Sequence, residues 1–295
     1  MNKFSKGWFS EVNDLWPGIS QSIQIEQILF DEVSRYQHIQ VFQTKFYGRM
    51  LVLDGVIQCT EKDEFSYQEM IAFLPLCSHS NPKSVLIVGG GDGGVAREVS
   101  KFPGINEIDQ IEIDEKVIEV SKKYLPFMAN GLSNPKVNLF IGDGYEYLKN
   151  QTKKYDIIIT DSSDPIGPAK ALFEMSYFHL IKRALNSNGI ICSQAGTIWA
   201  NFEQVKTTFS HCKALFSKTN YGIAPVPTYP TGQIGFVLGS LNPMQSSSTI
   251  GITPRKRRKQ SPSMPHNPQE SFSQRQVQGR NFRDSTYRKR ENLYL

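Results

Sequence analysis

Residues 84–98 read SVLIVGGGDGGVARE, which is an apolar run, a glycine-rich turn and a segment with the character of a helix. The β-branched residues at 84–88 are typical of a strand buried in a parallel sheet. Gly89, Gly91 and Gly94 fit the spacing G-x-G-x-x-G, in which the missing side chains allow a tight turn and bring a nucleotide close to the backbone. The stretch predicts a strand–turn–helix unit that binds a nucleotide or nucleoside; the alternative is a tight turn without a ligand.

The same turn contains a carboxylate, Asp92, close to the free amides expected at the start of the helix. In a turn that binds pyrophosphate this charge would repel the ligand, whereas beside an ammonium group it would attract it. Asp92 therefore favours a cofactor that carries a cation. The alternative is that Asp92 only caps the helix.

Strand-like and helix-like segments alternate from this stretch onward, which predicts a parallel sheet with helices on both faces. The expected strands are 85–88, 108–113, 137–141, 155–160 and 189–193, followed by an antiparallel hairpin of 216–223 and 233–238. Earlier in the chain, short apolar runs within residues 36–60 flank Asp54-Gly55, a hairpin signal, and predict a small antiparallel β domain. A helix is expected over residues 61–74, ended by Pro75.

Acidic residues follow four consecutive expected strands, and an amide follows the fifth. They are Asp92, then Glu112 and Asp114, then Asp143, then Asp161 and Asp164, and finally Gln194. Ligands of such sheets bind at the carboxyl ends of the strands. Each acid alone is open to the interpretation of a helix cap or a solvated loop residue. Together they predict an acidic cleft that would favour a polycation.

The net charge of the chain is unevenly distributed. Residues 244–295 hold eleven Lys and Arg against three Asp and Glu, and the preceding residues hold 22 against 25. The first part is thus slightly acidic, which favours cationic ligands and makes nucleic acid an unexpected partner. The second part is rich in Ser, Pro, Gln and Arg and is expected to be disordered. Its run RKRRK, from Arg255 to Lys259, is either a nuclear-localisation or nucleic-acid patch or only a solvated charge run.

Cysteine and histidine spacing bears on compartment and metal binding. The four cysteines show no C-x-x-C pairing, which is typical of reduced thiols in a cytoplasmic protein. The five histidines show no metal-ligand spacing, so no metal site is expected. No stretch approaches the roughly 18 apolar residues of a membrane span, and the first residues do not have the pattern of an export signal.

Six separated motifs resemble one family, the polyamine aminopropyltransferases, and in particular its eukaryotic spermidine synthases. They are LVLDGVIQCTEKDEFSYQEM at 51–70, GGGDGG at 89–94, EID at 112–114, GDG at 142–144, DSSDP at 161–165 and TYPTGQIGF at 228–236. The resemblance extends from about residue 7 to residue 243. It implies transfer of an aminopropyl group from decarboxylated S-adenosylmethionine to putrescine, which yields spermidine and methylthioadenosine. It also implies a homodimer and no prosthetic group.

The resemblance implies a role for each motif residue on the co-substrate side. Glu112 is expected to hold the ribose hydroxyls and Asp143 the adenine amino group. Further nucleoside contacts are expected from the turn glycines and two glutamines: Gly89, Gly91, Gly94, Gln43 and Gln58. Asp92 would pair with the amine that remains after decarboxylation and would repel the carboxylate of ordinary S-adenosylmethionine. This argues against a methyltransferase acting on putrescine.

On the acceptor side, an alkylamine titrates near ~10, and a protonated nitrogen has no lone pair with which to attack. The resemblance implies that Asp161 is the general base, with Tyr67 beside the attacking nitrogen. The other expected acceptor contacts are Trp16, Gln68, Asp164, Gln194 and Tyr229. Residues 162–172 resemble the gate loop of the family, which would order over bound substrates and exclude water.

The expected organisation is an N-terminal β domain over 1–62, a Rossmann-like, methyltransferase-type catalytic domain over 63–243, and a basic tail over 244–295. Two departures from the family keep alternatives open. Gly196 stands where many eukaryotic relatives have an acid, which leaves an aminopropyltransferase for another amine acceptor as one alternative. The tail does not continue the family pattern after Pro243, which leaves a truncated, non-catalytic isoform as another.

Overall fold

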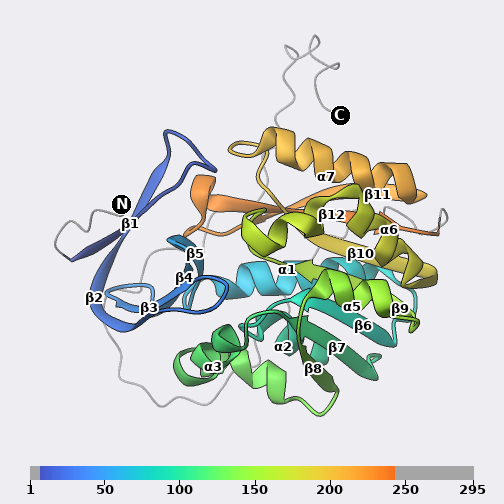
Figure 1. Cartoon of the computed structure of the whole chain (residues 1–295), viewed down its shortest axis with the longest axis horizontal. Coiled ribbons are helices and arrows are strands. Elements are labelled where there is room, and N and C mark those ends of the chain that lie inside the picture. The colour runs from blue at the N-terminus through green and yellow to red at the C-terminus, as the bar shows by residue number, and fades with distance from the viewer. Residues whose placement is uncertain (1–6, 243–295) are drawn as a thin grey trace, which may run out of the picture. The chain divides into compact units, whose positions relative to one another are not determined.

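The computed structural model describes residues 7–242, and the expected tail with its basic run lies outside this part of the chain. Two β-sheets make up the architecture (Figure 1). The larger sheet carries helices on both of its faces. The expected fold class, a Rossmann-like sheet preceded by a small antiparallel sheet, is confirmed.

The N-terminal sheet has five strands in the order β1-β2-β3-β4-β5, all paired antiparallel. They are β1 (Trp8–Val12), β2 (Ser20–Val33), β3 (His38–Thr44), β4 (Arg49–Leu53) and β5 (Val56–Thr60). Asp54 and Gly55 form the predicted hairpin turn, with φ of 49° and 80°. Strands β1 and β2 were not predicted, because most side chains of β2 are polar and partly or fully exposed, so its apolar alternation is weak.

The second sheet has seven strands in the order β11-β12-β10-β9-β6-β7-β8. They are β6 (Ser84–Gly89), β7 (Glu107–Glu112), β8 (Val137–Ile141), β9 (Tyr155–Asp161), β10 (Leu185–Gly196), β11 (Lys218–Pro225) and β12 (Gln233–Ser240). The first five are parallel and β12 is antiparallel to both β10 and β11, which confirms the predicted strands and closing hairpin. Strand β10 begins earlier than predicted.

Alternate residues of the central strands enter two separate cores, one on each face of the sheet. Val85, Ile87, Ile157 and Ile159 pack with helices α1 (Glu64–Ser78) and α2 (Gly94–Ser100). Their neighbours Leu86, Val88 and Ile158 pack on the other face with α5 (Gly144–Asn150), α6 (Met175–Arg183) and α7 (Phe202–Leu215). Burial on both faces explains why these strands are continuous apolar runs.

Helix α3 (Glu115–Tyr124) joins the two sheets. Its Val117 and Val120 share one buried cluster with Ile39, Val41 and Leu51 of the N-terminal sheet. The short helix α4 (Pro126–Ala129) adds Met128 to this cluster. The N-terminal sheet is therefore packed directly against helices of the second sheet.

Within residues 7–242 no helix is long and apolar enough to cross a membrane.

The predicted end of the first helix was wrong. Helix α1 continues through Pro75 to Ser78, and the carbonyl of Pro75 accepts a hydrogen bond from the amide of His79 at 3.1 Å. Pro75 lies in the last turn of the helix, where its ring removes one backbone hydrogen bond but no further turns depend on it. Burial of Pro75 and Leu76 against the sheet offsets that loss.

The glycine-rich turn brings β6 and β9 into close contact at their carboxyl ends. Gly89 has a φ of 88°, and the amide of Gly90 donates to the carbonyl of Asp161 at 2.9 Å. A Cβ on Gly89 would collide with that same carbonyl. Gly91 and Gly94 lack positive φ, but a side chain on Gly91 would meet Glu112 and one on Gly94 would collide with Gln68.

We predict that Gly89→Ala lowers the free energy of unfolding by roughly 2–4 kcal/mol, because it combines a left-handed backbone with a steric collision. Gly18→Ala is the matched control, since Gly18 also has positive φ (82°) but has nothing within 4 Å of the position that a methyl group would take. The control is expected to cost about 1 kcal/mol. Urea unfolding of both variants measures the difference, and equal losses would show that the close approach to Asp161 is not restrictive.

Candidate active site

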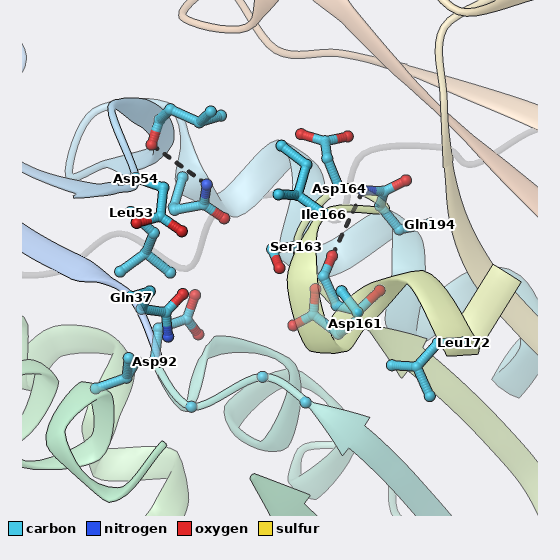
Figure 2. Close-up of a pocket in the computed structure, with 18 of the residues that line it drawn as sticks. Gln37, Leu53, Asp54, Asp92, Asp161, Ser163, Asp164, Ile166, Leu172 and Gln194 are labelled. Atoms are coloured by element: carbon cyan, nitrogen blue, oxygen red, sulfur yellow. Dashed lines mark hydrogen bonds between the residues drawn. The ribbon is translucent and has the colours of Figure 1, made fainter. Parts of the chain in front are cut away.

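A cavity of about 230 Å³ opens at the carboxyl ends of β6, β7, β9 and β10. The β4–β5 hairpin of the N-terminal sheet forms part of its wall through Leu53, Asp54 and Gln58. Six carboxyl side chains line it, and its lining within the described chain contains no lysine, arginine or histidine; the acids are Asp54, Asp92, Glu112, Asp143, Asp161 and Asp164. Figure 2 shows Asp92, Gln37 and Asp54 on one side of this space and Asp161, Asp164 and Gln194 on the other. The predicted acidic cleft is thus present.

Asp92 serves as a helix cap and also lines the cavity. Its Oδ1 accepts the amide N–H of Gly94 at 2.7 Å, at the start of α2. The side-chain amide of Gln68 donates to Asp92 Oδ2 at 3.2 Å, and Gln68 Oε1 has no hydrogen-bond partner in the described chain. Burial raises the pKa of Asp92, and the bonds from Gly94 and Gln68 oppose this increase. Asp92 and Gln68 together place carboxylate and amide oxygens in the cavity wall.

Glu112 is buried at the end of β7 and is held by two backbone amides. Gly91 donates to its Oε2 at 3.0 Å and Asp114 donates to its Oε1 at 2.9 Å. Burial raises the pKa of Glu112 to about 7. Asp114, by contrast, does not line the cavity, because its carboxylate caps α3 and accepts hydrogen bonds from Ser34 and Gln37.

Asp143 lies at the start of α5 and is exposed. Its Oδ1 accepts the amides of Tyr145 at 2.7 Å and Glu146 at 3.3 Å, so it caps the helix while lining the cavity. Its neighbour Gly144 also lines the cavity, as does Ile113, which directly follows β7. The order Asp92, Glu112, Asp143 follows the order of strands β6, β7 and β8 across the sheet.

The two predicted glutamines differ in position. Gln58 lines the cavity, and its amide donates to the carbonyl of Val56 at 3.2 Å. Gln43 lies outside the cavity lining, and its amide donates to the carbonyl of Thr44. It stands opposite Arg49 in the β3–β4 pairing, so the structure does not bring it to the site. Gln37 occupies the wall instead, held by Asp114; it precedes β3 and belongs to no motif.

Asp161 and Tyr67 are in direct contact. The phenol of Tyr67, on α1, donates to Asp161 Oδ1 at 2.5 Å. Asp161 is half-buried in the cavity wall, where burial and the nearby charge of Asp92 raise its pKa to about 8. Burial and the charge of Asp161 raise the pKa of Tyr67, so the phenol remains a donor. The pair can accept a proton at Asp161 while Tyr67 fixes the orientation of the carboxylate.

The far end of the cavity holds the residues expected at the acceptor. Burial raises the pKa of Asp164 to about 6, and the side chain of Gln194 opposes this. Gln194 in turn donates weakly to the carbonyl of Ser162 at 3.5 Å and accepts the amide of Gly196 at 2.8 Å. Trp16, buried at 5% exposure, and Tyr229 also line the cavity, and the ring of Tyr229 lies 6.1 Å from that of Tyr67.

The expected gate loop borders the same end. It includes all but the last residue of the 3-10 helix Gly167–Phe173, and Ser163 and Ile166 lie beside the cavity in Figure 2. Ile166 is 47% exposed. Among residues 7–242 no group of His, Cys, Asp or Glu is arranged to hold a metal ion.

Comparison with known proteins agrees with this geometry. Residues 64–248 match the spermine/spermidine synthase domain, and residues 7–61 match the spermidine synthase tetramerisation domain. The chain belongs to the spermine/spermidine synthase family.

Curated members of the family are similar over most of the chain. Spermidine synthase of Dictyostelium discoideum is 50% identical over 254 residues, which cover 86% of this chain and 89% of that protein. Spermidine synthase 2 of Arabidopsis thaliana is 51% identical over 242 residues, which cover 81% and 71% of the two chains. The resemblance drawn from the six motifs is confirmed, and the chain is an enzyme of this transferase family.

Solved structures of spermidine synthases share the fold. A crystal structure of spermidine synthase in complex with the transition state analogue AdoDATO has a TM-score of 0.78 and 30% identity, and the match covers 82% of this chain and 83% of that one. The enzyme of Thermotoga maritima has a TM-score of 0.75 and 29% identity, with 82% of each chain covered.

The raised carboxyl pKa values predict how the stability of the ligand-free protein depends on pH. The pKa of Asp161 rises from 3.8 to about 8 and that of Glu112 from 4.5 to about 7, so the folded state binds more protons than the unfolded state between these limits. Stability is then present at low pH and is lost as pH rises through the folded pKa values. We expect the Tm of the empty protein to be about 5 °C lower at pH 8 than at pH 5.5.

Thermal scans of the wild type and of Asp161→Asn measure this effect. The variant removes one of the titrating carboxyls and should show a shallower dependence of Tm on pH. A Tm that rises from pH 5.5 to pH 8 in the wild type would contradict the raised pKa values.

Proposed function

We propose that this chain is a spermidine synthase that transfers an aminopropyl group from decarboxylated S-adenosylmethionine to putrescine. One observation carries the proposal: the cavity has six carboxyl side chains and, within the described chain, no basic side chain. Both proposed substrates are cations, a sulfonium with a primary ammonium and a diammonium. Such ligands would supply the missing positive charge and return the carboxyls with raised pKa to their ionised form.

The co-substrate side of the cavity suits a nucleoside. Glu112 would accept hydrogen bonds from the ribose hydroxyls, and Asp143 would accept one from the adenine amino group. Asp92 would bind the ammonium of the aminopropyl arm. Gln68, expected from the resemblance at the acceptor, is hydrogen-bonded to Asp92, so we propose that its Oε1 contacts the same ammonium. The carboxylate of unmodified S-adenosylmethionine would meet Asp92 at the same place and be repelled.

Asp161 would act as the general base for the acceptor. It removes one proton from the proximal ammonium, which leaves a lone pair on that nitrogen. The nitrogen then attacks the carbon next to the sulfonium, a C–N bond forms as the C–S bond breaks, and methylthioadenosine departs as a neutral thioether. No acid is needed for this leaving group, so the base and the alignment of the two substrates account for the catalysis.

The distal ammonium of the acceptor would be bound at the other end, by Asp164 with Gln194, while Trp16 would contact the methylenes. Ordering of residues 162–172 over the substrates would exclude water. Gly196 lines this end without a charged side chain, so Asp164 is the carboxylate proposed to select the distal amine.

We further propose that the chain assembles with copies of itself through the N-terminal sheet, since residues 7–61 match a tetramerisation domain. The expected homodimer would be one level of such an assembly. A cytoplasmic location is proposed from the four cysteines, all of which are free.

Mass spectrometry of the full-length chain incubated with decarboxylated S-adenosylmethionine and putrescine tests the reaction. We expect spermidine and methylthioadenosine in equal amounts from the wild type. Asp161→Asn should lower kcat by roughly 10²–10⁴-fold, because the proximal amine then keeps its proton. A folded wild-type chain that forms no product would overturn the proposal and favour a non-catalytic role, and a panel of diamines in the same assay identifies a different acceptor.

The selectivity assigned to Asp92 gives a second prediction. Asp92→Asn should weaken binding of decarboxylated S-adenosylmethionine by roughly 30-fold or more, because a charge pair is lost, and should leave S-adenosylmethionine binding unchanged or tighter. Asp143→Asn is the control, since a contact to adenine should affect both nucleosides equally. Calorimetric titration of both variants with both nucleosides measures the ratio, and a uniform loss in Asp92→Asn would refute the assignment.

A further inference from the structure

A carboxylate outside the cavity, Asp63, connects the two sheets. It lies between the end of β5 and the start of α1 and is 5% exposed. Its Oδ1 accepts the hydroxyl of Thr60 at 2.5 Å. Its Oδ2 accepts both the amide and the hydroxyl of Thr228, at 2.9 and 2.7 Å, although Thr228 is 165 residues away in the sequence. Both partners are buried, so these bonds are shielded from water.

Thr228 belongs to the turn that connects β11 and β12. Three backbone hydrogen bonds close this turn: Val226 to Gly232, Tyr229 to Val226 and Gly232 to Tyr229, at 2.9–3.0 Å. Thr231 within it has a φ of 65°, which is strained for a β-branched residue. Strain of this kind costs roughly 1–3 kcal/mol and persists only where the surrounding contacts over-determine the conformation. The bonds to Asp63 link the turn to another element through buried groups.

Tyr229 follows Thr228 and carries the turn into the cavity. Its ring lies 6.1 Å from that of Tyr67, and its phenol donates to the carbonyl of Gln58 on β5. The start of the turn is therefore fixed at two neighbouring residues, Thr228 by Asp63 and Tyr229 by the backbone of β5. A shift of Thr228 therefore moves Tyr229 relative to Tyr67 and Asp161.

We propose that Asp63 is a positioning residue that sets acceptor affinity by holding Thr228, and with it Tyr229, in place. The inference rests on the proposed function, because it assigns Tyr229 to the diamine end of the cavity. Asp63 touches no reacting atom and does not line the cavity. We expect its effect to fall on the acceptor, since the phenol of Tyr229 bonds only the backbone carbonyl of Gln58, and the other proposed nucleoside contacts in the cavity come from β6, β7 and the turns that follow β6 and β8.

Thr228→Val tests the inference, because valine keeps the shape and the backbone amide but removes the hydroxyl. We expect KM for putrescine to increase roughly threefold to tenfold, the effect of one hydrogen bond, with KM for the nucleoside unchanged. Thr228→Ser keeps the hydroxyl and should restore the wild-type value. Asp63→Asn retains the shape of the side chain but removes its charge and replaces one acceptor oxygen with a donor. It should also raise KM for putrescine and leave KM for the nucleoside unchanged.

Thr60→Val is the matched control. It removes the other hydrogen bond of the same carboxylate without touching the turn, so it should lower Tm by a similar amount and leave the ratio of the two KM values unchanged. The inference is overturned if Thr228→Val changes both KM values equally, or changes only Tm and the active fraction. If the wild type forms no spermidine at all, the proposed function and this inference fall together; a wild type that is active with an unchanged KM ratio in Thr228→Val refutes the inference alone.

Discussion

The contact between the backbone of Gly89 and Gly90 and the carbonyl of Asp161 joins the carboxyl ends of β6 and β9. No side chain fits between these strands at this point, so the two chain segments meet at backbone distance. Asp161 ends one strand and Asp92 follows the other by three residues. The backbone contact that joins the turn to β9 therefore also places the carboxylates of Asp92 and Asp161 in the same cavity. They are close enough for the charge of Asp92 to raise the pKa of Asp161.

Collecting carboxyls in this way opposes stability. Arg97, a half-buried cation on α2, is already paired with Glu64 at 2.8 Å and Glu98 at 2.7 Å, and it does not line the cavity. The lining acids are left with hydrogen bonds from amides and a phenol, which do not neutralise a charge. The raised pKa values of four of them, Asp92, Glu112, Asp161 and Asp164, express that imbalance, and a cationic ligand would relieve it. Function and the destabilisation of the empty protein thus have the same source.

Sequence patterns predicted the elements whose own residues favour the conformation that the whole fold requires. The central strands β6 and β9 are apolar on both faces, and acids follow or end the parallel strands, so the strands and the site were predicted from the same stretches of sequence. The predictions failed at positions whose structure depends on contacts with residues distant in the sequence. Pro75 stays helical because its neighbours are buried, β2 forms although most of its side chains are polar, and Gln37 reaches the cavity because Asp114 holds it. Asp63 was also missed, since its partner Thr228 lies far along the chain.

The N-terminal sheet and the second sheet form one functional unit, although each has its own strand order. The β4–β5 hairpin supplies part of the cavity wall, and Ile39, Val41 and Leu51 share a core with α3, whose N-cap Asp114 also fixes Gln37. Removing the N-terminal sheet would therefore expose the core of α3 and open the cavity at the wall made by the β4–β5 hairpin. The packing between the sheets also determines the shape of the cavity, because Leu51 of β4 and Val117 of α3 belong both to this shared core and to the cavity lining.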